Sequence, residues 1–339
     1  MRVIKDHKAC PTELRCGVVA LGNFDGFHRG HQAVIGEAGR IARAHGQPLL
    51  VLTTDPHPRR FFAPNADRFV LTPSNERVFL LERFGADGLA LLPFDDALSQ
   101  TTAEDFVDTI LVAGLGVKHV VVGYDYHFGK GRKGNVEVLK HLGESRGFEV
   151  HVLSPVSVGV EGAAGEVYSS TLVREALKAG EPRRSAALLG HWWAIEGVVE
   201  KGDQRGRTID FPTANIQLGE TISPKYGVYA VRAEDVASGR VYEGVANIGI
   251  RPTTSNPTER LEAYLFDFSG DLYDKTLRVE LVGFVRAERK FEDFEALKAQ
   301  IHQDVDSAKL ILADPDNARG HFPFPTLDSY LRLYPDPLI

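Results

Sequence analysis

The chain has 339 residues, enough for two domains at the usual size of roughly 100 to 200 residues each. Its 43% hydrophobic and 25% charged residues are typical of a globular protein and argue against a disordered chain. The net charge of -7 disfavours nucleic acid as a partner, because proteins that bind phosphate backbones gather Lys and Arg on one face. Two cysteines, Cys10 and Cys16, are too few for a disulfide framework or a structural zinc site.

The N-terminal segment, residues 1–15, is charged throughout and lacks the apolar stretch of a signal peptide. No later run approaches the ~18 apolar residues of a membrane-spanning helix. We therefore expect a cytoplasmic protein without a membrane partner.

From residue 16 to about residue 180, short β-branched runs alternate with amphipathic segments. The expected strands are 17–21, 49–53, 89–92, 119–122 and 149–153, and the expected helices are 32–44, 74–83, 102–112 and 136–144. Alternation of strands and helices of these lengths predicts a parallel sheet with right-handed crossovers. The first half is therefore expected to be a doubly wound, Rossmann-like α/β domain.

After residue 180 the pattern changes to closely spaced strands with glycine-rich turns. A short helix at 182–189 precedes strands at 192–200, 228–233, 241–248, 261–268 and 276–284, and a long helix follows at 291–313. This order predicts a small antiparallel β-barrel with one C-terminal helix. We divide the chain into 1–185, 186–313 and a tail, 314–339, rich in proline and aromatic residues, whose role the sequence leaves open.

The segment GNFDGFHRGH, residues 22–31, follows the first strand and runs into a helix. In an open parallel sheet a ligand is expected at this carboxyl end. Gly22 and Gly26 permit close approach of the backbone to a ligand, and the helix start offers N–H groups and a positive dipole end to phosphate. His28 and His31 are three residues apart, on one face of the first turn, so two imidazole donors can bind the β- and γ-phosphates of ATP.

The histidine pair resembles the HxGH signature of the nucleotidylyltransferase superfamily, and the whole segment is similar to its FMN adenylyltransferase branch. Three further segments agree in order: TTDPHP at 53–58 with Thr54 where Phe is usual, GYDYHFGKGRKGN at 123–135 with Tyr126 in place of Phe, and YSSTLVR at 168–174. The resemblance implies that ATP is bound by Gly22, Phe24, Asp25, Gly26, His28, His31, Ser170, Thr171 and Arg174, and FMN by His57, Asp125 and Phe128.

In the reaction that this resemblance implies, an FMN phosphate oxygen attacks the α-phosphorus of ATP in line and pyrophosphate leaves. The protein must then supply alignment and positive charge on the developing pyrophosphate. The catalytic roles fall to His28, His31 and Arg174, together with Mg²⁺.

The loop 129–134 also spells GxGxxG, which by itself would suggest the dinucleotide site of a dehydrogenase. It lies late in the predicted sheet and is flanked by lysines and aromatic residues, so a loop that covers a flavin or nucleotide is the better interpretation.

The segment GVVEKGDQRGRTIDFPTANI, residues 197–216, has a glycine-spaced basic turn followed by PTAN, and the chain contains no P-loop. Thr213 and Asn215 are two residues apart, so in an extended segment both face one side and could ligate one cation. The segment resembles the PTAN motif of riboflavin kinases, with Asp210 where Gly is commoner. The resemblance implies that ATP is bound by Gly197, Lys201, Gly202, Gly206, Thr213 and Asn215, and Mg²⁺ by Thr213 and Asn215.

Further segments continue this resemblance in order: PKYGVYAV at 224–231, GVANIGIRPT at 244–253 and LEAYLFDF at 261–268. Glu262 aligns with the glutamate that serves riboflavin kinases as general base on the ribityl 5′-hydroxyl. Residues 284–304 resemble the segment that leads into the family's final helix, which implies that Arg286 and Glu288 contact the flavin.

Together these resemblances identify a bifunctional riboflavin kinase and FMN adenylyltransferase, with ATP, riboflavin and FMN as substrates, FAD as product and Mg²⁺ as cofactor. Two alternatives stay open. Only one domain could be active, with Asp210 as the departure in the kinase half, or the chain could be a flavin-binding regulator that keeps the fold without turnover. The sequence does not decide whether the chain forms a homo-oligomer, whether FMN passes between the sites, or whether flavins inhibit.

Overall fold

The computed structural model describes residues 1–157, 165–201, 211–251 and 258–339. Within this part the chain forms two compact units, each built from more than one stretch of sequence. The first contains Met1–Asp67, Thr72–Ser169 and Phe324–Ile339, and the second contains Arg68–Leu71 and Ser170–Pro323. The predicted boundary between residues 185 and 186 stays a prediction.

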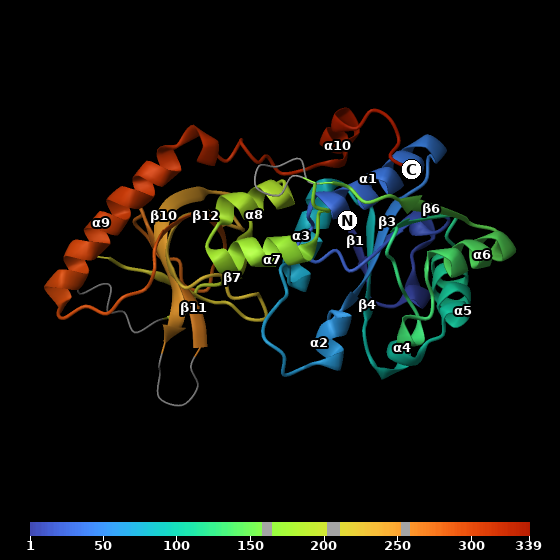
Figure 1. Cartoon of the computed structure of the whole chain (residues 1–339), viewed down its shortest axis with the longest axis horizontal. Coiled ribbons are helices and arrows are strands. Elements are labelled where there is room, and N and C mark those ends of the chain that lie inside the picture. Colours follow the sequence, from blue (N-terminus) through green and yellow to red (C-terminus); the bar gives the residue numbers. More distant parts are fainter. Residues whose placement is uncertain (158–164, 202–210, 252–257) are drawn as a thin grey trace. The chain divides into compact units, whose positions relative to one another are not determined.

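The first unit is built on a sheet of six strands in the order β1-β4-β3-β2-β5-β6, with every pair parallel. Figure 1 labels β1, β3, β4 and β6 of this sheet. The strands are β1 (Arg2–Ile4), β2 (Val18–Leu21), β3 (Leu49–Asp55), β4 (Gly88–Pro93), β5 (His119–Gly123) and β6 (Glu149–Leu153). The doubly wound α/β fold is thereby confirmed. The sequence pattern missed β1, a three-residue edge strand with a single buried side chain.

Helices pack on both faces of this sheet. The helical segments of this unit up to α6 are η1 (His7–Ala9), η2 (Thr12–Leu14), α1 (Arg29–His45), α2 (Pro58–Phe62), α3 (Ser74–Phe84), α4 (Asp96–Gln100), α5 (Ala103–Asp105), the π-helical η3 (Phe106–Leu115), η4 (Lys130–Arg132) and α6 (Val136–Arg146). Alternate strand residues face opposite sides. Val19 and Leu21 of β2 pack in a core with η3 and α6, whereas Val18 and Ala20 pack in a second core with α1 and α3.

The position of β2 in the sheet determines where a ligand can bind. β2 lies between β3 and β5, and the chain leaves it toward β3 before it crosses later to β5. The order of strands reverses at this point, so the carboxyl ends of β2 and β5 border the crevice in which open α/β sheets bind ligands.

The end of the chain belongs to the first unit. Its helix α10 (Leu327–Leu333) packs on α1, where Leu327 and Tyr330 are buried. The Tyr330 hydroxyl donates a hydrogen bond of 2.8 Å to Oε1 of the fully buried Glu37. The predicted tail therefore includes a structural element of the α/β unit.

The second unit is an antiparallel sheet of six strands in the order β7-β12-β9-β10-β11-β8. The strands are β7 (Ala194–Val198), β8 (Ala214–Gln217), β9 (Gly227–Asp235), β10 (Val241–Arg251), β11 (Thr258–Leu265) and β12 (Thr276–Arg286). Glu200, just beyond β7, forms a bridge to Asn215 of β8, so the two ends of the sheet meet and the barrel is nearly closed. The predicted barrel is confirmed.

Within the described residues, this unit has four helical segments. They are α7 (Ser170–Ala179), α8 (Pro182–Leu189), α9 (Phe294–Ala313) and η6 (Pro315–Asn317). Ala308 and Leu312 of α9 pack with Val228 and Val245, so α9 covers one face of β9 and β10. No helix in the described ranges is long and apolar enough to cross a membrane.

Candidate active sites

The histidine pair lies at the start of α1, just beyond the carboxyl end of β2. His28 is the N-cap of α1, and its Nδ1 accepts a hydrogen bond of 3.3 Å from the backbone N–H of His31. The two imidazole rings are stacked, with centroids 3.6 Å apart and planes inclined by 22°. Because Nδ1 of His28 accepts, the proton of its neutral ring lies on Nε2, which makes Nε2 the hydrogen-bond donor.

The turn that leads to this pair uses unusual backbone geometry. Gly26 has a φ of 93°, and Phe24 and Phe27 also lie in the left-handed region, with φ of 50° and 49°. Both phenylalanines are buried, and the Phe24 ring contacts the His31 ring edge-on at a centroid distance of 5.3 Å. A side chain at Gly22 would begin 2.9 Å from the Phe24 ring. Phe24 thus packs behind the histidines, and its predicted contact with ATP stays a prediction.

Asp25 holds this turn in place through hydrogen bonds with Thr72. Its carboxylate is buried and accepts a hydrogen bond of 2.9 Å from the Thr72 N–H, while the Thr72 hydroxyl accepts one of 2.9 Å from the Gly26 N–H. These contacts with the protein itself position the glycine turn. The predicted contact of Asp25 with ATP stays a prediction.

A buried arginine supports the same region. Arg77 of α3 donates hydrogen bonds to the backbone carbonyls of Thr54 at 3.0 Å and Thr72 at 3.3 Å. Burial lowers the pKa of the Arg77 guanidinium, and the nearby carboxylates of Asp25 and Asp55 oppose that shift. Arg77 therefore ties the end of β3 to the glycine turn.

Gly30 is a further residue of this site that the prediction did not include. A Cβ at this position would lie 3.1 Å from Cε1 and Nδ1 of His28 and 3.3 Å from the Cβ of Tyr168. The His28 ring thus occupies the space that a side chain at position 30 would need. The glycine inside the HxGH signature was the signal that could have identified it.

The residues predicted to bind FMN differ in their surroundings. His57 follows β3 and caps α2, with its Nδ1 accepting a hydrogen bond of 3.1 Å from the Arg59 N–H. Asp125 is exposed just after β5. Phe128, in contrast, is buried against Phe106, with ring centroids 5.5 Å apart. His57 and Asp125 thus follow strands that flank β2, whereas the Phe128 ring is part of the core.

The predicted phosphate-binding residues Ser170, Thr171 and Arg174 all lie on α7 in the second unit. Thr171 is exposed. Nε of Arg174 donates a hydrogen bond of 2.7 Å to the backbone carbonyl of Phe69, and its guanidinium lies over the Phe69 ring, 5.6 Å from the centroid. The short segment Arg68–Leu71 thus orients Arg174.

The second group of predicted residues comes together in the barrel by strand register. Glu262 of β11 is paired with Asn215 of β8 on one side and with Asn247 of β10 on the other. Residues directly opposite across antiparallel strands project from the same face, so the three side chains share one side of the sheet. Sequence reasoning predicted Glu262 and Asn215 but not Asn247, although Asn247 lies within the matched segment GVANIGIRPT at 244–253.

Asn215 meets the requirement for a cation ligand. The residue is buried, its Nδ2 donates a hydrogen bond of 3.2 Å to the Thr213 carbonyl, and its Oδ1 has no hydrogen-bond donor within the described residues. Buried amide oxygens are ordinarily satisfied, so an oxygen of this kind fits a hard cation such as Mg²⁺. Asn215 is thus suitable as a metal ligand, and the predicted part of Thr213 stays a prediction.

Arg286 and Glu288 have different partners. Arg286 is the last residue of β12, and Glu288 lies two residues further along the chain. The Arg286 guanidinium forms a two-point ion pair with the buried Asp304 of α9, at 2.8 Å and 2.7 Å. Glu288 accepts a hydrogen bond of 3.1 Å from Asn247 and lies where a side chain at Gly249 would be. Arg286 therefore joins β12 to α9, and Glu288 lies beside the Glu262 face.

The predicted nucleotide loop of the barrel is described only at its ends. Gly197 lies within β7, where a Cβ would come within 2.6 Å of Ile216 of β8, so close strand packing requires glycine there. Lys201 is exposed, with its Nζ 5.7 Å from the centroid of the Tyr273 ring. Gly202, Gly206 and Asp210 lie outside the described residues.

An aromatic group near this face was not predicted. Phe211 lies edge-on to Tyr264 and to His302 of α9, with both centroid distances 5.0 Å. Tyr264 is two residues from Glu262 on β11, so both side chains project from the same face. Aromatic rings beside a carboxylate and amides provide a surface suited to a flat heterocycle.

Comparison with known proteins matches two families to two parts of the chain. The family described as FAD synthetase matches residues 10–170, and the family described as riboflavin kinase matches residues 189–312. The chain is 39% identical over 308 residues to the bifunctional riboflavin kinase/FMN adenylyltransferase of Pseudomonas fluorescens, covering 91% of this chain and 96% of that protein. It is 38% identical over 292 residues to the protein of the same name from Escherichia coli K12, covering 86% and 91%.

Among solved structures, the chain is similar to one described as a macrolide-efflux protein from Streptococcus pneumoniae. The TM-score is 0.78 and the identity 32%, with 91% of this chain and 98% of that chain covered. The description of that structure names an activity different from that of the relatives above, and it applies to that protein alone.

Proposed function

The chain belongs to the bifunctional riboflavin kinase/FMN adenylyltransferase family, and from that premise we propose how its residues divide two reactions. The barrel phosphorylates riboflavin to FMN, and the α/β half adenylylates FMN to FAD with release of pyrophosphate. Each reaction consumes one ATP. A cytoplasmic location and the oligomeric state stay predictions.

In the adenylyl transfer, the FMN phosphate attacks the α-phosphorus of ATP while the bond to the β-phosphate breaks. We propose that Nε2–H of His28 and the ring of His31 donate hydrogen bonds to the leaving pyrophosphate. The positive end of the α1 dipole, at its N-terminus, also stabilises the negative charge of that group. The predicted phosphate ligands Ser170, Thr171 and Arg174 lie on α7 in the second unit, and their part in this reaction stays a prediction. Asp25 and Gly30 act by holding the glycine turn and the His28 ring in place.

In the phosphoryl transfer, Glu262 accepts the proton of the ribityl 5′-hydroxyl as that oxygen attacks the γ-phosphorus of ATP. Asn247 and Glu288 border the same face and orient the alcohol. Thr213 and Asn215 hold Mg²⁺, which when bound neutralises charge on the phosphates. Lys201 and the glycines of its loop complete the proposed ATP site.

The observation that carries this proposal is the strand register that places Glu262 beside Asn215 and Asn247, in a different unit from the stacked His28 and His31. Two separate sets of groups suited to two phosphate chemistries support a bifunctional enzyme. A regulator that only binds flavin has no use for both sets.

The test uses two variants that preserve local structure. Asn is a strong N-cap, so His28→Asn keeps the cap of α1 but removes the imidazole donor. We expect FAD formation to fall by about 10² to 10³-fold while riboflavin is still converted to FMN. Glu262→Gln keeps the size of the side chain and removes the base, and we expect FMN formation to fall by about 10² to 10⁴-fold.

Flavin products are separated by chromatography after incubation with riboflavin or FMN, ATP and Mg²⁺. Glu262→Gln should convert supplied FMN to FAD at the wild-type rate. FMN without FAD from the wild-type chain would eliminate the adenylyltransferase, and no product at all would favour the regulator. Loss of both activities from either single change would contradict independent sites.

A further inference from the structure

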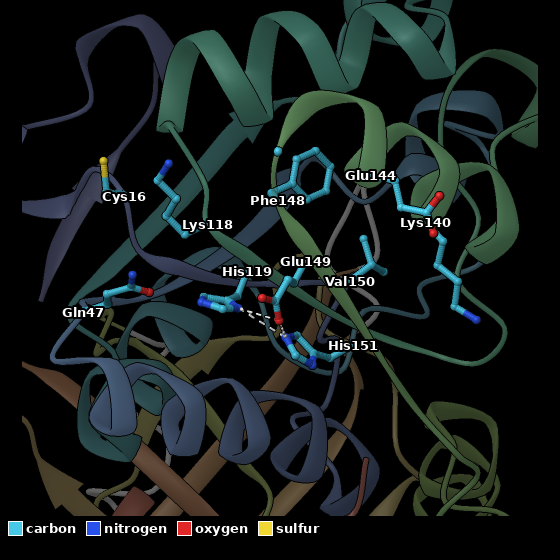
Figure 2. Close-up of a pocket in the computed structure, with 12 residues that line it drawn as sticks. Cys16, Gln47, Lys118, His119, Lys140, Glu144, Phe148, Glu149, Val150 and His151 are labelled. Atoms are coloured by element: carbon cyan, nitrogen blue, oxygen red, sulfur yellow. Dashed lines mark hydrogen bonds and ion pairs between the residues drawn. The ribbon is translucent and has the colours of Figure 1, made fainter.

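Three potential metal ligands converge at the amino ends of β5 and β6 (Figure 2). Nδ1 of His119 lies 3.3 Å from Nε2 of His151, and Oε2 of Glu149 lies 3.6 Å from the first nitrogen and 3.7 Å from the second. The three atoms thus form a nearly equilateral triangle. The proposed reactions use none of these residues.

Strand register produces this arrangement. His119 and Glu149 are the first residues of β5 and β6 and are paired with one another, and His151 is two residues further along β6. All three side chains therefore project from the same face of the parallel sheet. Since β5 and β6 begin here, the cluster is at the opposite edge of the sheet from His28, which follows the carboxyl end of β2.

The size of the triangle matches the coordination shell of one small ion. Zn²⁺ binds imidazole nitrogen at about 2.0–2.1 Å and carboxylate oxygen at about 2.0–2.2 Å, usually in tetrahedral geometry. Two such ligands at a tetrahedral angle are about 3.3–3.5 Å apart. The two nitrogens already have this spacing, and the exposed Glu149 side chain can close the remaining few tenths of an ångström by rotation.

The His119 side chain is held in place by its neighbours. It is buried, and its ring lies against that of His45, at the end of α1, with centroids 4.7 Å apart.

The cluster is accessible to ligands. It lies in a pocket of about 730 Å³ whose other lining residues include Cys16, Lys118 and Lys140. Two imidazoles and one carboxylate leave a fourth tetrahedral position, which water or a small ligand can occupy from the pocket. Such an open position distinguishes this arrangement from a closed structural zinc site.

We propose that His119, Glu149 and His151 form a binding site for a divalent transition-metal ion of the Zn²⁺ class, with one coordination position open to the pocket. The site links the first residues of two neighbouring strands. A plain hydrogen bond between the two imidazoles is the competing explanation for their 3.3 Å separation, and it requires no metal.

The full-length chain, stripped of metal with a chelator, is titrated with Co²⁺ in saturating Mg²⁺, so that magnesium sites are filled. Co²⁺ reports tetrahedral coordination through its visible absorption. We expect one tightly bound Co²⁺ that Zn²⁺ displaces, and a dissociation constant at least about tenfold higher in His151→Gln and in Glu149→Gln. His141→Gln removes an exposed histidine of α6 outside the pocket lining and is the matched control, expected to bind as the wild type does.

Each variant is checked by circular dichroism and by FAD formation, which should be unchanged because these residues lie outside the proposed active sites. The wild-type chain with bound Co²⁺ is also examined by proton NMR. We expect two imidazole N–H signals shifted by the paramagnetic ion, and this measurement does not depend on the folding of any variant. Absence of a visible band at Co²⁺ concentrations up to about 0.1 mM would overturn the metal site in favour of the hydrogen bond. The same conclusion would follow if His151→Gln bound Co²⁺ as tightly as the wild type.

Discussion

At the scale of single residues, the α/β site depends on how tightly its neighbours confine the His28 ring. Its Nδ1 is engaged by the His31 N–H, its ring stacks on that of His31, and Gly30 leaves the space that it occupies. Three features therefore fix the orientation of Nε2 of His28: the hydrogen bond from the His31 N–H, the stacking on the His31 ring and the absence of a side chain at Gly30. A change that moves the ring by a fraction of an ångström should affect catalysis before it affects folding.

Gly30→Ala tests this confinement. The new Cβ would lie 3.1 Å from the His28 ring and displace it. We expect FAD formation to fall by about tenfold or more, in line with the sensitivity of such sites to small displacements. Alanine favours a helix over glycine by up to about 1 kcal/mol, so the free energy of unfolding should stay level or rise. Urea titration and FAD assays on the same preparation measure both, and a parallel fall in stability and activity would refute the argument.

The buried imidazole of His119 and the half-buried imidazole of His151 predict a pH dependence of stability. Burial lowers the pKa of both in the folded chain, whereas in the unfolded chain they protonate near pH 6.5. The unfolded chain then binds more protons below about pH 6.5, so the free energy of unfolding should be fully retained above that pH and fall as the pH drops toward 5. With a chelator present, His151→Gln should show a shallower fall than the wild type in urea titrations. An identical slope would contradict the prediction.

Residue roles were only partly predictable from the sequence. The motifs identified His28, His31, Asn215 and Glu262, and the structure places these in two polar groups. The same motif strings also contain residues whose contacts in the structure are packing, hydrogen bonds or ion pairs, and whose predicted contacts with ligands stay predictions. Phe128 is in the core, Asp25 holds Thr72, Gly197 accommodates Ile216 and Arg286 pairs with Asp304. A motif records which residues recur together, but it does not separate a group that contacts substrate from one that supports it.

At the scale of elements, α1 serves two surfaces. Its first turn carries the histidine pair, and its middle packs against α10 through Gly36 and Gly39, which face Tyr330 and Leu327. Hydrophobic periodicity predicted α1, because its apolar residues recur on one face. It did not predict that a segment nearly 300 residues later would cover it, since only the small size of two glycines signals that contact.

Gly36→Ala tests the contact between α1 and α10. Its Cβ would lie 2.3 Å from the Tyr330 ring, so α10 must shift, and we expect the free energy of unfolding to fall by about 1–3 kcal/mol. In a Tyr330→Ala background the ring is absent, and the same change should instead stabilise α1 by up to about 1 kcal/mol. Urea denaturation of the four proteins completes the double-mutant cycle. Equal effects in both backgrounds would show that the two residues do not interact.

At the scale of the whole molecule, the two compact units do not follow a single cut in the sequence. Arg68–Leu71 belongs with the barrel, where the Phe69 carbonyl accepts from Arg174, and the Leu71 carbonyl accepts a hydrogen bond of 2.9 Å from Nε1 of the buried Trp193. α7 likewise belongs there, with the Lys225 N–H donating a hydrogen bond of 3.0 Å to the Leu177 carbonyl. The sequence pattern that placed a boundary near residue 185 could not predict these contacts, because the periodicity of strands and helices depends only on neighbouring residues.

Fragments of the kinase half decide where its folding unit begins. A fragment of residues 170–323 keeps α7 and should phosphorylate riboflavin. A fragment of residues 186–323 loses the buried side chains of Val173 and Leu177. Because each large buried side chain contributes about 1.5–3 kcal/mol, the free energy of unfolding of this shorter fragment should be lower by several kcal/mol. Both lack Leu71, which leaves the Trp193 donor unsatisfied at a cost of about 1–3 kcal/mol relative to the full chain. Urea titrations followed by tryptophan fluorescence, with FMN formation as the second readout, rank the three proteins. Equal stability of the two fragments would instead support a boundary at residues 185 and 186, with α7 independent of the barrel.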